Sequence, residues 1–440
     1  MAEESVELGM SNVTRRQFLQ WTAAVGTTGF PLTGRGSSGR VVVIGGGVGG
    51  ITAAKSIKKA APSLNVILVE QKKHYSACFM SNEVLAHSRS LESLRFTYDG
   101  LWKYGITVVN QSAVAIDAAV HKVILEGGAV LEYDRLIVSP GIDLRYDVIV
   151  GYNRRVAEKL PHAWTSGDQI GLLRTQLEAM QDGGTVLIAA PKNPFRCPSA
   201  PYERASQIAW YLQRYKPKSK IILLDAKEIF SQQALFMEAW RALYGFGTQN
   251  SLIDWHPASE EGTVTRVDPD AMAVYSGELD TVTKGAVINL IPPQMAGMIA
   301  RTSGLTDDTY WCPVNKTTFE STKAKDVHIL GDACNAQDMP KSAYSAASQA
   351  QCVAAVVVSA MSGVGEIPLF THLNACYSIL GQDWAISTVG VYRSNSTGTI
   401  LQSVEGSGGT SSPGAGATQR KHAVEYAHSW YQNITHALFT

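Results

Sequence analysis

Three glycines near the start of the chain have the spacing of a loop that binds nucleotide phosphates. Gly45, Gly47 and Gly50 fit the pattern G-x-G-x-x-G. In this pattern the first glycine allows a tight turn, the second lets the backbone approach a pyrophosphate, and the third packs helix against strand. The β-branched run 40–44 precedes the glycines, and residues 51–61 follow with helical spacing. Because a helix N-terminus offers unpaired N–H groups to phosphates, we expect a dinucleotide site here.

Acidic residues at the ends of two further predicted strands indicate which dinucleotide is bound. The strand 65–69 ends at Glu70, which lies 20 residues beyond Gly50 and suits a ribose diol. Residues 326–332 form a strand that ends in Gly-Asp. Two-dinucleotide flavoproteins carry this pattern, and its aspartate, here Asp332, binds the ribityl chain of FAD. Taken alone, Asp332 could equally cap a helix, but its strand and spacing favour FAD.

The six cysteines are too few for a disulfide framework, but they suffice for one redox pair or one metal site. Sequence alone does not show which of them pair, since many connectivities are open. The scattered histidines have no metal-ligand spacing, so we expect no metal. A single cysteine is most often a small buried apolar residue, and we assign this role to Cys312, Cys334 and Cys352.

The strand 185–189 should begin a second nucleotide-binding unit, but no glycine loop follows it. Residues 190–198 instead contain three prolines, which remove N–H donors, and bulky side chains where a backbone must approach a phosphate. A helix at 202–215 and a strand at 220–224 complete the unit. We therefore expect a domain that keeps the nucleotide-binding fold without binding NAD(P)H, with Cys197 where the nicotinamide site would open.

Length and charge exclude several classes of protein. At roughly 150 residues per domain, the 440 residues predict about three domains. The 38 basic and 38 acidic residues cancel, so no global charge favours nucleic acid. No uninterrupted apolar run reaches the roughly 18 residues of a spanning helix, and the nearest is 352–364. We expect no integral membrane segment.

Residues 1–36 have the composition of an export signal rather than a domain. Residues 14–19 contain a twin-arginine pattern, which a weakly apolar stretch at 21–30 and a Gly/Ser-rich stretch follow. Such signals export folded proteins, often with their cofactor bound, so we expect the protein in the periplasm. The alternative is a disordered tail that happens to contain two arginines.

With these motifs in place, the sequence resembles the flavoprotein subunits of flavocytochrome c sulfide dehydrogenases, which are relatives of the sulfide:quinone oxidoreductases. The resemblance covers nearly the whole chain, including the twin-arginine leader. The matching segments are 74–83, 195–198, 201–207, 373–379 and 427–431.

The resemblance implies an α/β fold with two dinucleotide-binding domains, like that of glutathione reductase, and a C-terminal interface domain. Residues 136–141 resemble the strand that leaves the FAD domain of such proteins, and we expect 404–416, rich in Gly and Ser, to be a mobile surface loop. The expected parts are a signal segment (1–36), an FAD-binding domain in two pieces (37–150 and 278–363), a degenerate NAD-like domain (151–277) and the interface domain (364–440).

The resemblance also implies roles for three cysteines. Cys78 corresponds to the residue that bonds through sulfur to the 8α carbon of FAD. Cys197 and Cys376 correspond to a redox-active disulfide beside the isoalloxazine ring. Sulfide can attack such a disulfide by ordinary exchange to give a persulfide, and two electrons then pass to the flavin. Lys341 is a candidate for the positive charge near the flavin N1–O2 edge, against the alternative of a surface lysine. Arg196 could lower a thiolate pKa or simply face solvent.

The implied electron acceptor is a separate c-type cytochrome subunit, in a heterodimer. The chain lacks the C-x-x-C-H pattern of c-type haem attachment, so haem c would be on the partner alone. Residues 426–439 are aromatic but interrupted by polar side chains, which argues against quinone reduction at a bilayer. Two alternatives remain open: a sulfide:quinone oxidoreductase, and a non-catalytic flavin-binding or sulfur-carrying subunit.

Overall fold

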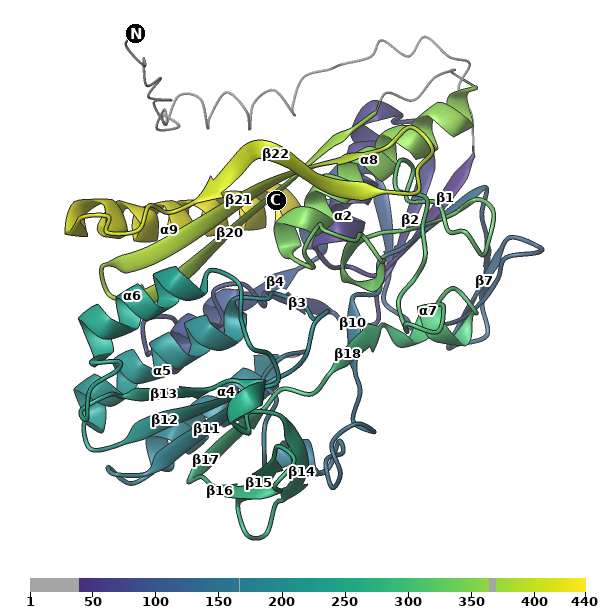
Figure 1. Cartoon of the computed structure of the whole chain (residues 1–440). Coiled ribbons are helices and arrows are strands. Elements are labelled where there is room, and N and C mark those ends of the chain that lie inside the picture. Colours follow the sequence, from purple (N-terminus) through teal and green to yellow (C-terminus); the bar gives the residue numbers. More distant parts are fainter. Residues whose placement is uncertain (1–38, 166, 364–368) are drawn as a thin grey trace, which may run out of the picture. The chain divides into compact units, whose positions relative to one another are not determined.

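The first sheet contains five parallel strands in the order β19-β9-β1-β2-β5. Figure 1 shows its strands β1 and β2 near the helices α2 and α8. The computed structural model describes residues 39–165, 167–363 and 369–440, so the predicted signal segment, 1–36, lies outside the described residues. Helices α2 and α8 pack against each other beside this sheet. The elements are β1 (Arg40–Ile44), α2 (Val48–Ala60), β2 (Asn65–Val69), β5 (Ile106–Val109), β9 (Arg135–Val138), β19 (Val327–Ile329) and α8 (Ala343–Ser362).

The register of this sheet brings the ends of several strands to one edge. Ile44 of β1 pairs in parallel with Val69 of β2 and with Val138 of β9, and β19 continues the sheet beyond β9. These strands are almost wholly buried and apolar, as expected for a parallel sheet covered on both faces. The segments that follow them, the glycine loop, Glu70 and the turn that carries Asp332, therefore gather at the same edge.

Smaller sheets accompany the first sheet. A three-stranded antiparallel sheet and an antiparallel pair arise from segments between its strands, and a second antiparallel pair lies where the chain enters and leaves the middle domain. They are β6 (Ala113–Asp117), β7 (Lys122–Leu125) and β8 (Val130–Glu132); β3 (His74–Ser76) with β4 (Arg95–Thr97); and β10 (Ile142–Leu144) with β18 (Gln294–Ala296). Short helices are α3 (Asn82–Leu85) and α7 (Met298–Thr302).

The middle domain repeats the plan of the first with a four-stranded parallel sheet, β13-β12-β11-β17, and an antiparallel sheet of three strands. Because β17 pairs with β11, this domain extends past residue 277, where the sequence placed its end. Its elements are α4 (Gly167–Ala179), β11 (Thr185–Ala190), α5 (Ala200–Tyr215), β12 (Lys220–Asp225), α6 (Gln233–Tyr244), β13 (Ile253–His256), β14 (Val264–Asp268), β15 (Ala273–Ser276), β16 (Thr281–Lys284) and β17 (Val287–Leu290).

Protein side chains surround the acidic residue that ends β12 of the middle domain. Asp225 ends β12, as Glu70 follows β2, but its side chain is fully buried. Its carboxylate accepts hydrogen bonds from the Tyr202 hydroxyl (2.6 Å) and the Trp255 indole N–H (3.1 Å), and it contacts the Lys227 ammonium at 2.5 Å. The parallel sheet confirms that the domain keeps the fold, and protein donors occupy the Asp225 carboxylate. The loss of NAD(P)H binding stays a prediction.

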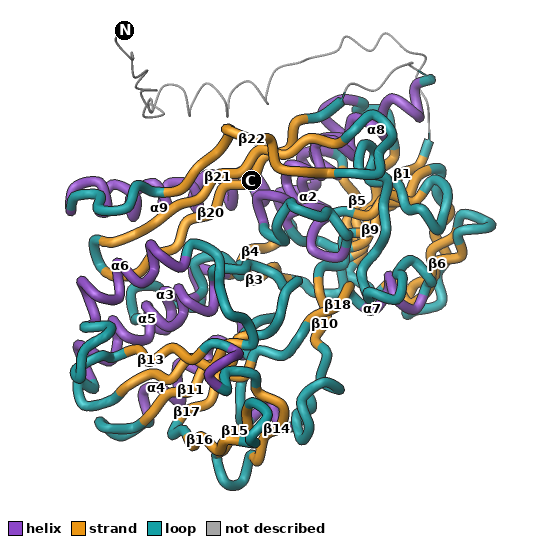
Figure 2. The backbone as a smooth tube through the Cα atoms, viewed as in Figure 1, coloured by secondary structure: helices purple, strands orange, loops and turns teal. Residues whose placement is uncertain are grey.

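The C-terminal part is a three-stranded antiparallel sheet with one long helix. It contains β20 (Thr371–Gly381), β21 (Trp384–Ser394), β22 (Leu401–Thr410) and α9 (Ala417–Phe439). The prediction of a loop over 404–416 was wrong for its first part, because β22 pairs with β21 through residue 410 (Figure 2). Glycines Gly408 and Gly409, both at positive φ, give this edge strand a loop-like composition without preventing its hydrogen bonds.

Among the described residues, α8 is long and apolar enough to cross a membrane by length and composition. It is longer than the run 352–364 that the sequence singled out, because small residues extend its apolar character toward Ala343. In the structure 56% of that window is buried inside the protein, where α8 packs on α2 and β20.

Candidate functional site

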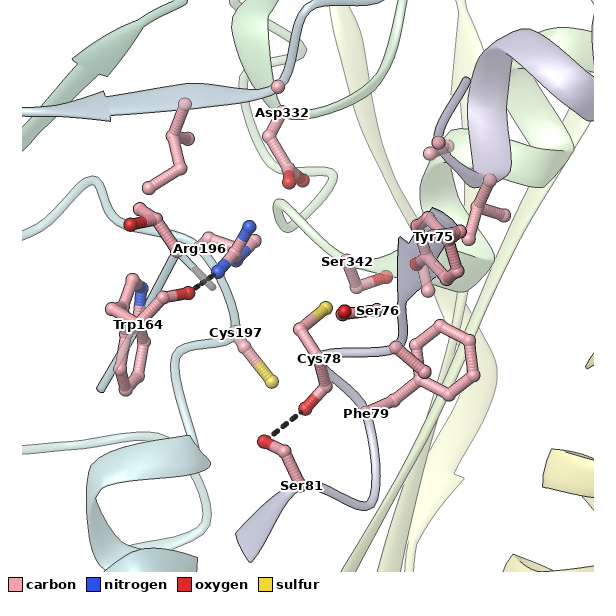
Figure 3. Close-up of a pocket in the computed structure, with 18 of the residues that line it drawn as sticks. Tyr75, Ser76, Cys78, Phe79, Ser81, Trp164, Arg196, Cys197, Asp332 and Ser342 are labelled. Carbon is pink, nitrogen blue, oxygen red and sulfur yellow. Dashed lines mark hydrogen bonds between the residues drawn. The ribbon is translucent and has the colours of Figure 1, made fainter. Parts of the chain in front are cut away.

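A cavity of about 450 Å³ opens at the edge of the first sheet and is lined by residues from all three domains. The glycine loop and Glu70 line one part of it, and Cys78, Cys197 and Cys376 line another. In Figure 3 the Asp332 carboxylate and the sulfurs of Cys78 and Cys197 point into this space. Residues from distant parts of the sequence therefore converge on one chamber.

The glycine loop has the shape that a dinucleotide needs. Gly45 has φ +102°, and a Cβ there would lie 2.2 Å from the Ser139 carbonyl oxygen, while a Cβ on Gly50 would lie 1.9 Å from the Gly45 oxygen. A Cβ on Gly47 would meet no atom within 4 Å, and Gly47 lines the cavity. The first and third glycines are thus required by close packing, and the second faces open space, as an approaching pyrophosphate requires.

Two carboxylates lie where the sugar parts of FAD would need them. Glu70 accepts hydrogen bonds from the N–H groups of Gly46 (2.7 Å) and Lys72 (2.8 Å), and a carboxylate keeps acceptor capacity beyond two bonds. Asp332 Oδ1 is buried without a hydrogen-bond partner among the described residues. Burial raises the pKa of Asp332, and the charges of Arg196 and Lys341 oppose this rise. An orphaned acceptor aimed into a cavity calls for a donor such as a ribityl hydroxyl, so these residues fit FAD.

Cys78 lies on a loop between β3 and α3 that the C-terminal helix holds in place. Its carbonyl accepts a hydrogen bond from the Ser81 hydroxyl at 2.6 Å, and its side chain is exposed to the cavity. The neighbouring Phe79 ring packs edge-on against Trp430 and Tyr431 of α9, with centroids 5.3 and 5.7 Å apart. The loop therefore presents a sulfur from a backbone that aromatic contacts fix.

Cys197, in the loop before α5, and Cys376, in β20, both line the cavity. Both are thiols in the structure. Burial raises the pKa of Cys197, and Cys376 is the next largest cause of that rise, so the two thiols are electrostatic neighbours. Cys197 has φ +58°, and its N–H donates to the Lys341 carbonyl at 2.8 Å. Cys376 Sγ lies 3.5 Å from Asn374 Oδ1. Their pairing as a disulfide stays a prediction.

Arg196 is a charged residue whose side chain lines the cavity. The Arg196 guanidinium donates to the Trp164 carbonyl and interacts electrostatically with the Asp332 and Cys197 side chains. Although burial alone would lower its pKa, the nearby Cys78 and Asp332 raise it, so Arg196 is a cation inside the site and does not simply face solvent.

Glu203 was not predicted as a functional residue. It accepts hydrogen bonds from the Ile379 N–H (2.8 Å) and the Asn82 amide (2.7 Å). Burial raises its pKa to about 7 despite these bonds, and its charge raises the pKa of both Cys197 and Cys376. A carboxyl that titrates near neutrality beside two thiols can accept or donate a proton there. Its position in the first turn of α5, shortly after Cys197, was the available sequence signal.

Models of known protein families match most of the described chain. The model "Sulfide dehydrogenase [flavocytochrome c] flavoprotein chain, central" matches residues 170–292, and "Flavocytochrome c sulphide dehydrogenase, flavin-binding" matches 368–439. "Pyridine nucleotide-disulphide oxidoreductase" matches 39–169. The sulfide dehydrogenase [flavocytochrome c] flavoprotein chain of Chlorobaculum thiosulfatiphilum is 51% identical over 45 residues, which are 10% of this chain and 94% of that sequence. The chain belongs to the flavocytochrome c sulfide dehydrogenase flavoprotein family.

Sulfide:quinone oxidoreductases are similar to this flavoprotein over a longer stretch. The mitochondrial sulfide:quinone oxidoreductase of Mus musculus is 25% identical over 320 residues, which cover 71% of this chain and 68% of the mouse protein. The solved structure of the Aquifex aeolicus sulfide:quinone oxidoreductase has a TM-score of 0.69 at 16% identity, covering 90% of this chain and 91% of that one. The likeness confirms the predicted fold class.

Lys341 was predicted to lie near the flavin, but it is not among the residues that line the cavity. Its ammonium donates to the carbonyls of Asp332 (2.7 Å) and Cys334 (2.8 Å) and lies 3.7 Å from the centroid of the Trp311 ring. It also does not face solvent, which was the alternative. Lys341 instead fixes the turn that carries Asp332 and, through its own carbonyl, the backbone of Cys197.

We expect Gly47→Val to fold but to lose bound flavin, because its side chain would enter space that the pyrophosphate needs. The flavin absorbance per chain should fall at least roughly tenfold while the melting temperature of the flavin-free protein stays unchanged. Gly416→Val is the matched control, since a Cβ on Gly416 also meets no atom within 4 Å but Gly416 lies outside the cavity. Normal flavin content in Gly47→Val would contradict the assignment.

Proposed function

We propose that this flavoprotein is the sulfide-oxidising subunit of a flavocytochrome c sulfide dehydrogenase, exported to the periplasm. The observation that carries the proposal is the meeting of Cys78, Cys197 and Cys376 in one cavity with the orphaned Asp332 oxygen. In the proposed working form Cys197 and Cys376 are joined as a disulfide, and Cys78 holds FAD covalently. FAD, when bound, supplies an acceptor for two electrons.

The first chemical step is thiol–disulfide exchange with hydrosulfide as the nucleophile. Attack on one sulfur breaks the bond between Cys197 and Cys376, leaves a persulfide on the attacked cysteine and releases the other as a thiolate. No net oxidation has occurred at this point. Two electrons must leave before the disulfide can form again with loss of the sulfane sulfur, which is why the cysteine pair and the electron acceptor share one cavity.

Arg196 supplies the charge that this step needs. Hydrosulfide and the released thiolate are anions, and the cavity contains the ionisable carboxyls of Asp332 and Glu203, which would repel them. The Arg196 guanidinium, anchored on the Trp164 carbonyl, lies close to Cys197. A fixed cation next to a cysteine favours its thiolate, so we assign to Arg196 both attraction of hydrosulfide and stabilisation of the thiolate.

Glu203 is placed to handle the proton. With a pKa raised to about 7, it is protonated below neutral pH and ionised above it. In the ionised form it can take the proton of H₂S or of a thiol, and in the neutral form it can return it. Because its two oxygens are held by the Ile379 N–H and the Asn82 amide, its position is fixed relative to both cysteines.

The proposed electron acceptor is a c-type cytochrome subunit that carries all the haem of the complex. This assignment rests on family membership and on the family name of the matched models. The similarity to sulfide:quinone oxidoreductases makes a quinone the acceptor that an assay must separate from a cytochrome. The periplasmic location rests on the twin-arginine pattern within residues 14–19.

Sulfide should reduce an external c-type cytochrome in the presence of the purified protein, without membranes or quinone. We expect Cys376→Ser to lower this rate by roughly 10³-fold or more, because the exchange step loses its leaving group. Cys352→Ser is the matched control, since Cys352 is buried outside the cavity with its thiol on the Thr317 carbonyl. Turnover with a soluble quinone but not with cytochrome would replace this proposal by the quinone-linked one, and unchanged activity of Cys376→Ser would favour a non-catalytic subunit.

The tether to FAD can be tested apart from turnover. After denaturation in acid, the flavin of the wild-type protein should stay with the polypeptide, because a thioether survives unfolding. In Cys78→Ser the flavin should separate completely, while the native variant still binds FAD through the glycine loop, Glu70 and Asp332. Release of flavin from the denatured wild-type protein would show that Cys78 forms no such bond.

The pH dependence of sulfide oxidation should report Glu203. For a base with a pKa of about 7, kcat/KM rises as the pH passes upward through neutrality, since only the ionised form accepts a proton. We expect Glu203→Gln to lower kcat/KM by about 10²–10⁴-fold and to remove the part of the pH profile that differs from the titration of sulfide itself. A variant that keeps the wild-type profile and rate would rule out Glu203 as the base.

A further inference from the structure

A second pair of cysteines lies beside the turn that carries Asp332. Cys312 and Cys334 pair with each other across a parallel β-bridge. The Cys312 N–H donates to the Ala333 carbonyl at 3.0 Å, and the Asn335 N–H donates to the Cys312 carbonyl at 2.9 Å. These two bonds enclose Cys334 and fix the two cysteines in register, although 22 positions separate them in the sequence.

Both cysteines are thiols in the structure, and a bridge of this kind is compatible with the Cα spacing of a disulfide. Strands joined by such hydrogen bonds lie about 4.8 Å apart, and disulfides join residues whose Cα atoms are roughly 4.4–6.8 Å apart. Residues paired across a bridge also direct their side chains to the same face. In agreement with this, burial raises the pKa of Cys312 to about 12, and Cys334 is the next largest cause of that rise.

The pair is separate from the cavity. Both residues are fully buried, and neither is among the residues that line the cavity with Cys197 and Cys376. The Lys341 ammonium holds the Cys334 carbonyl at 2.8 Å, so one residue lies between the two cysteine pairs. Sulfide that enters the cavity therefore has no direct path to Cys312 or Cys334.

We propose that Cys312 and Cys334 form a second, structural disulfide that ties the segment before residue 314 to the turn of Asp332. Formation breaks two S–H bonds and makes one S–S bond. The two protons and two electrons pass to an oxidised low-molecular-weight disulfide, which leaves as two thiols after exchange through a mixed disulfide. The turn 308–310 is exposed and ends two residues before Cys312, so local opening of this turn gives the oxidant access.

Bond formation removes one long hydrogen bond of the Cys334 thiol but leaves no buried acceptor without a partner. Cys334 Sγ donates to Gln349 Oε1 at 3.5 Å, but the same oxygen accepts a shorter bond, 2.7 Å, from the Gly331 N–H. When Cys334 loses its proton to the disulfide, Gln349 Oε1 therefore keeps a partner. The cross-link then fixes residues 331–334, and with them the carboxylate that we assign to FAD binding.

Peptide mapping tests this proposal directly. The protein is denatured with an alkylating reagent and without reductant, and is then digested with trypsin. Peptides 302–316 and 326–341, which contain Cys312 and Cys334, should appear as one species lighter by two hydrogen atoms than their sum, and should separate on reduction. Alkylated, separate peptides would overturn the proposal.

The same digest tests the linkages of the proposed function separately from the bridge between Cys312 and Cys334. Peptide 197–204 joined to 342–393 reports a bridge from Cys197, and fragmentation of the linked peptide places that bridge at Cys376 or at Cys352, the other cysteine of 342–393. Peptide 74–89 with bound flavin reports the tether of Cys78. Each linkage is therefore present or absent independently of the others, and either cysteine bridge can fail without affecting the evidence for the other.

A stability measurement checks that the bridge acts in the folded protein. Reductant should lower the melting temperature of the wild-type protein, and this reductant-dependent shift should be smaller by roughly 2–6 °C in Cys312→Ala, which has lost one of the two bridges. Cys352→Ala, another fully buried cysteine, should keep the full shift. An equal reductant-dependent shift in wild type and Cys312→Ala would overturn the proposal.

Discussion

The parallel register of β1 with β2 and β9 is the constraint on which the site depends. In this register the strand ends lie at one edge of the sheet, so the loops that follow them must meet there. The glycine loop, Glu70 and the turn of Asp332 line one cavity because this edge collects them. Buried apolar strands hold the register, since a shift along β1 would leave buried backbone groups unpaired and expose apolar side chains.

The middle domain shows how a nucleotide fold changes use without losing its sheet. Tyr202, Lys227 and Trp255 surround Asp225 with donors, so the carboxylate at the end of β12 stabilises the domain instead of binding a ribose. The loop after β11, which lacks the glycines of a phosphate loop, carries Arg196 and Cys197 to the cavity. This position in the fold thus delivers a sulfur and a cation to the site.

The charged residues of the cavity stabilise one another. Asp332 and Glu203 are buried acids whose pKa values burial raises, and Arg196 is a buried cation whose charge their neighbourhood supports. A buried ion is costly unless it is paired, so each of these groups depends on the others and on what binds in the cavity. This arrangement stabilises small anions near Cys197 and leaves one carboxyl free to exchange a proton near neutral pH.

The sequence by itself determined the elements whose chemistry is local. The bounds of β1 and β2, the glycine loop and the loss of glycines after β11 follow from patterns within short stretches, because a turn or a phosphate loop involves neighbouring residues. The strand β22 was missed because its glycines have the composition of a loop, and pairing with β21 overrides that tendency.

Tertiary structure alone decided the distances between residues that are remote in the sequence. It brought Cys197 and Cys376 to one cavity, moved Lys341 from the predicted flavin edge to the carbonyls of Asp332 and Cys334, and placed Cys312 opposite Cys334. It also gave Glu203 its raised pKa, which burial produces. A sequence records residue types and spacing, but burial and contact depend on how separate segments pack, and only the folded chain fixes those.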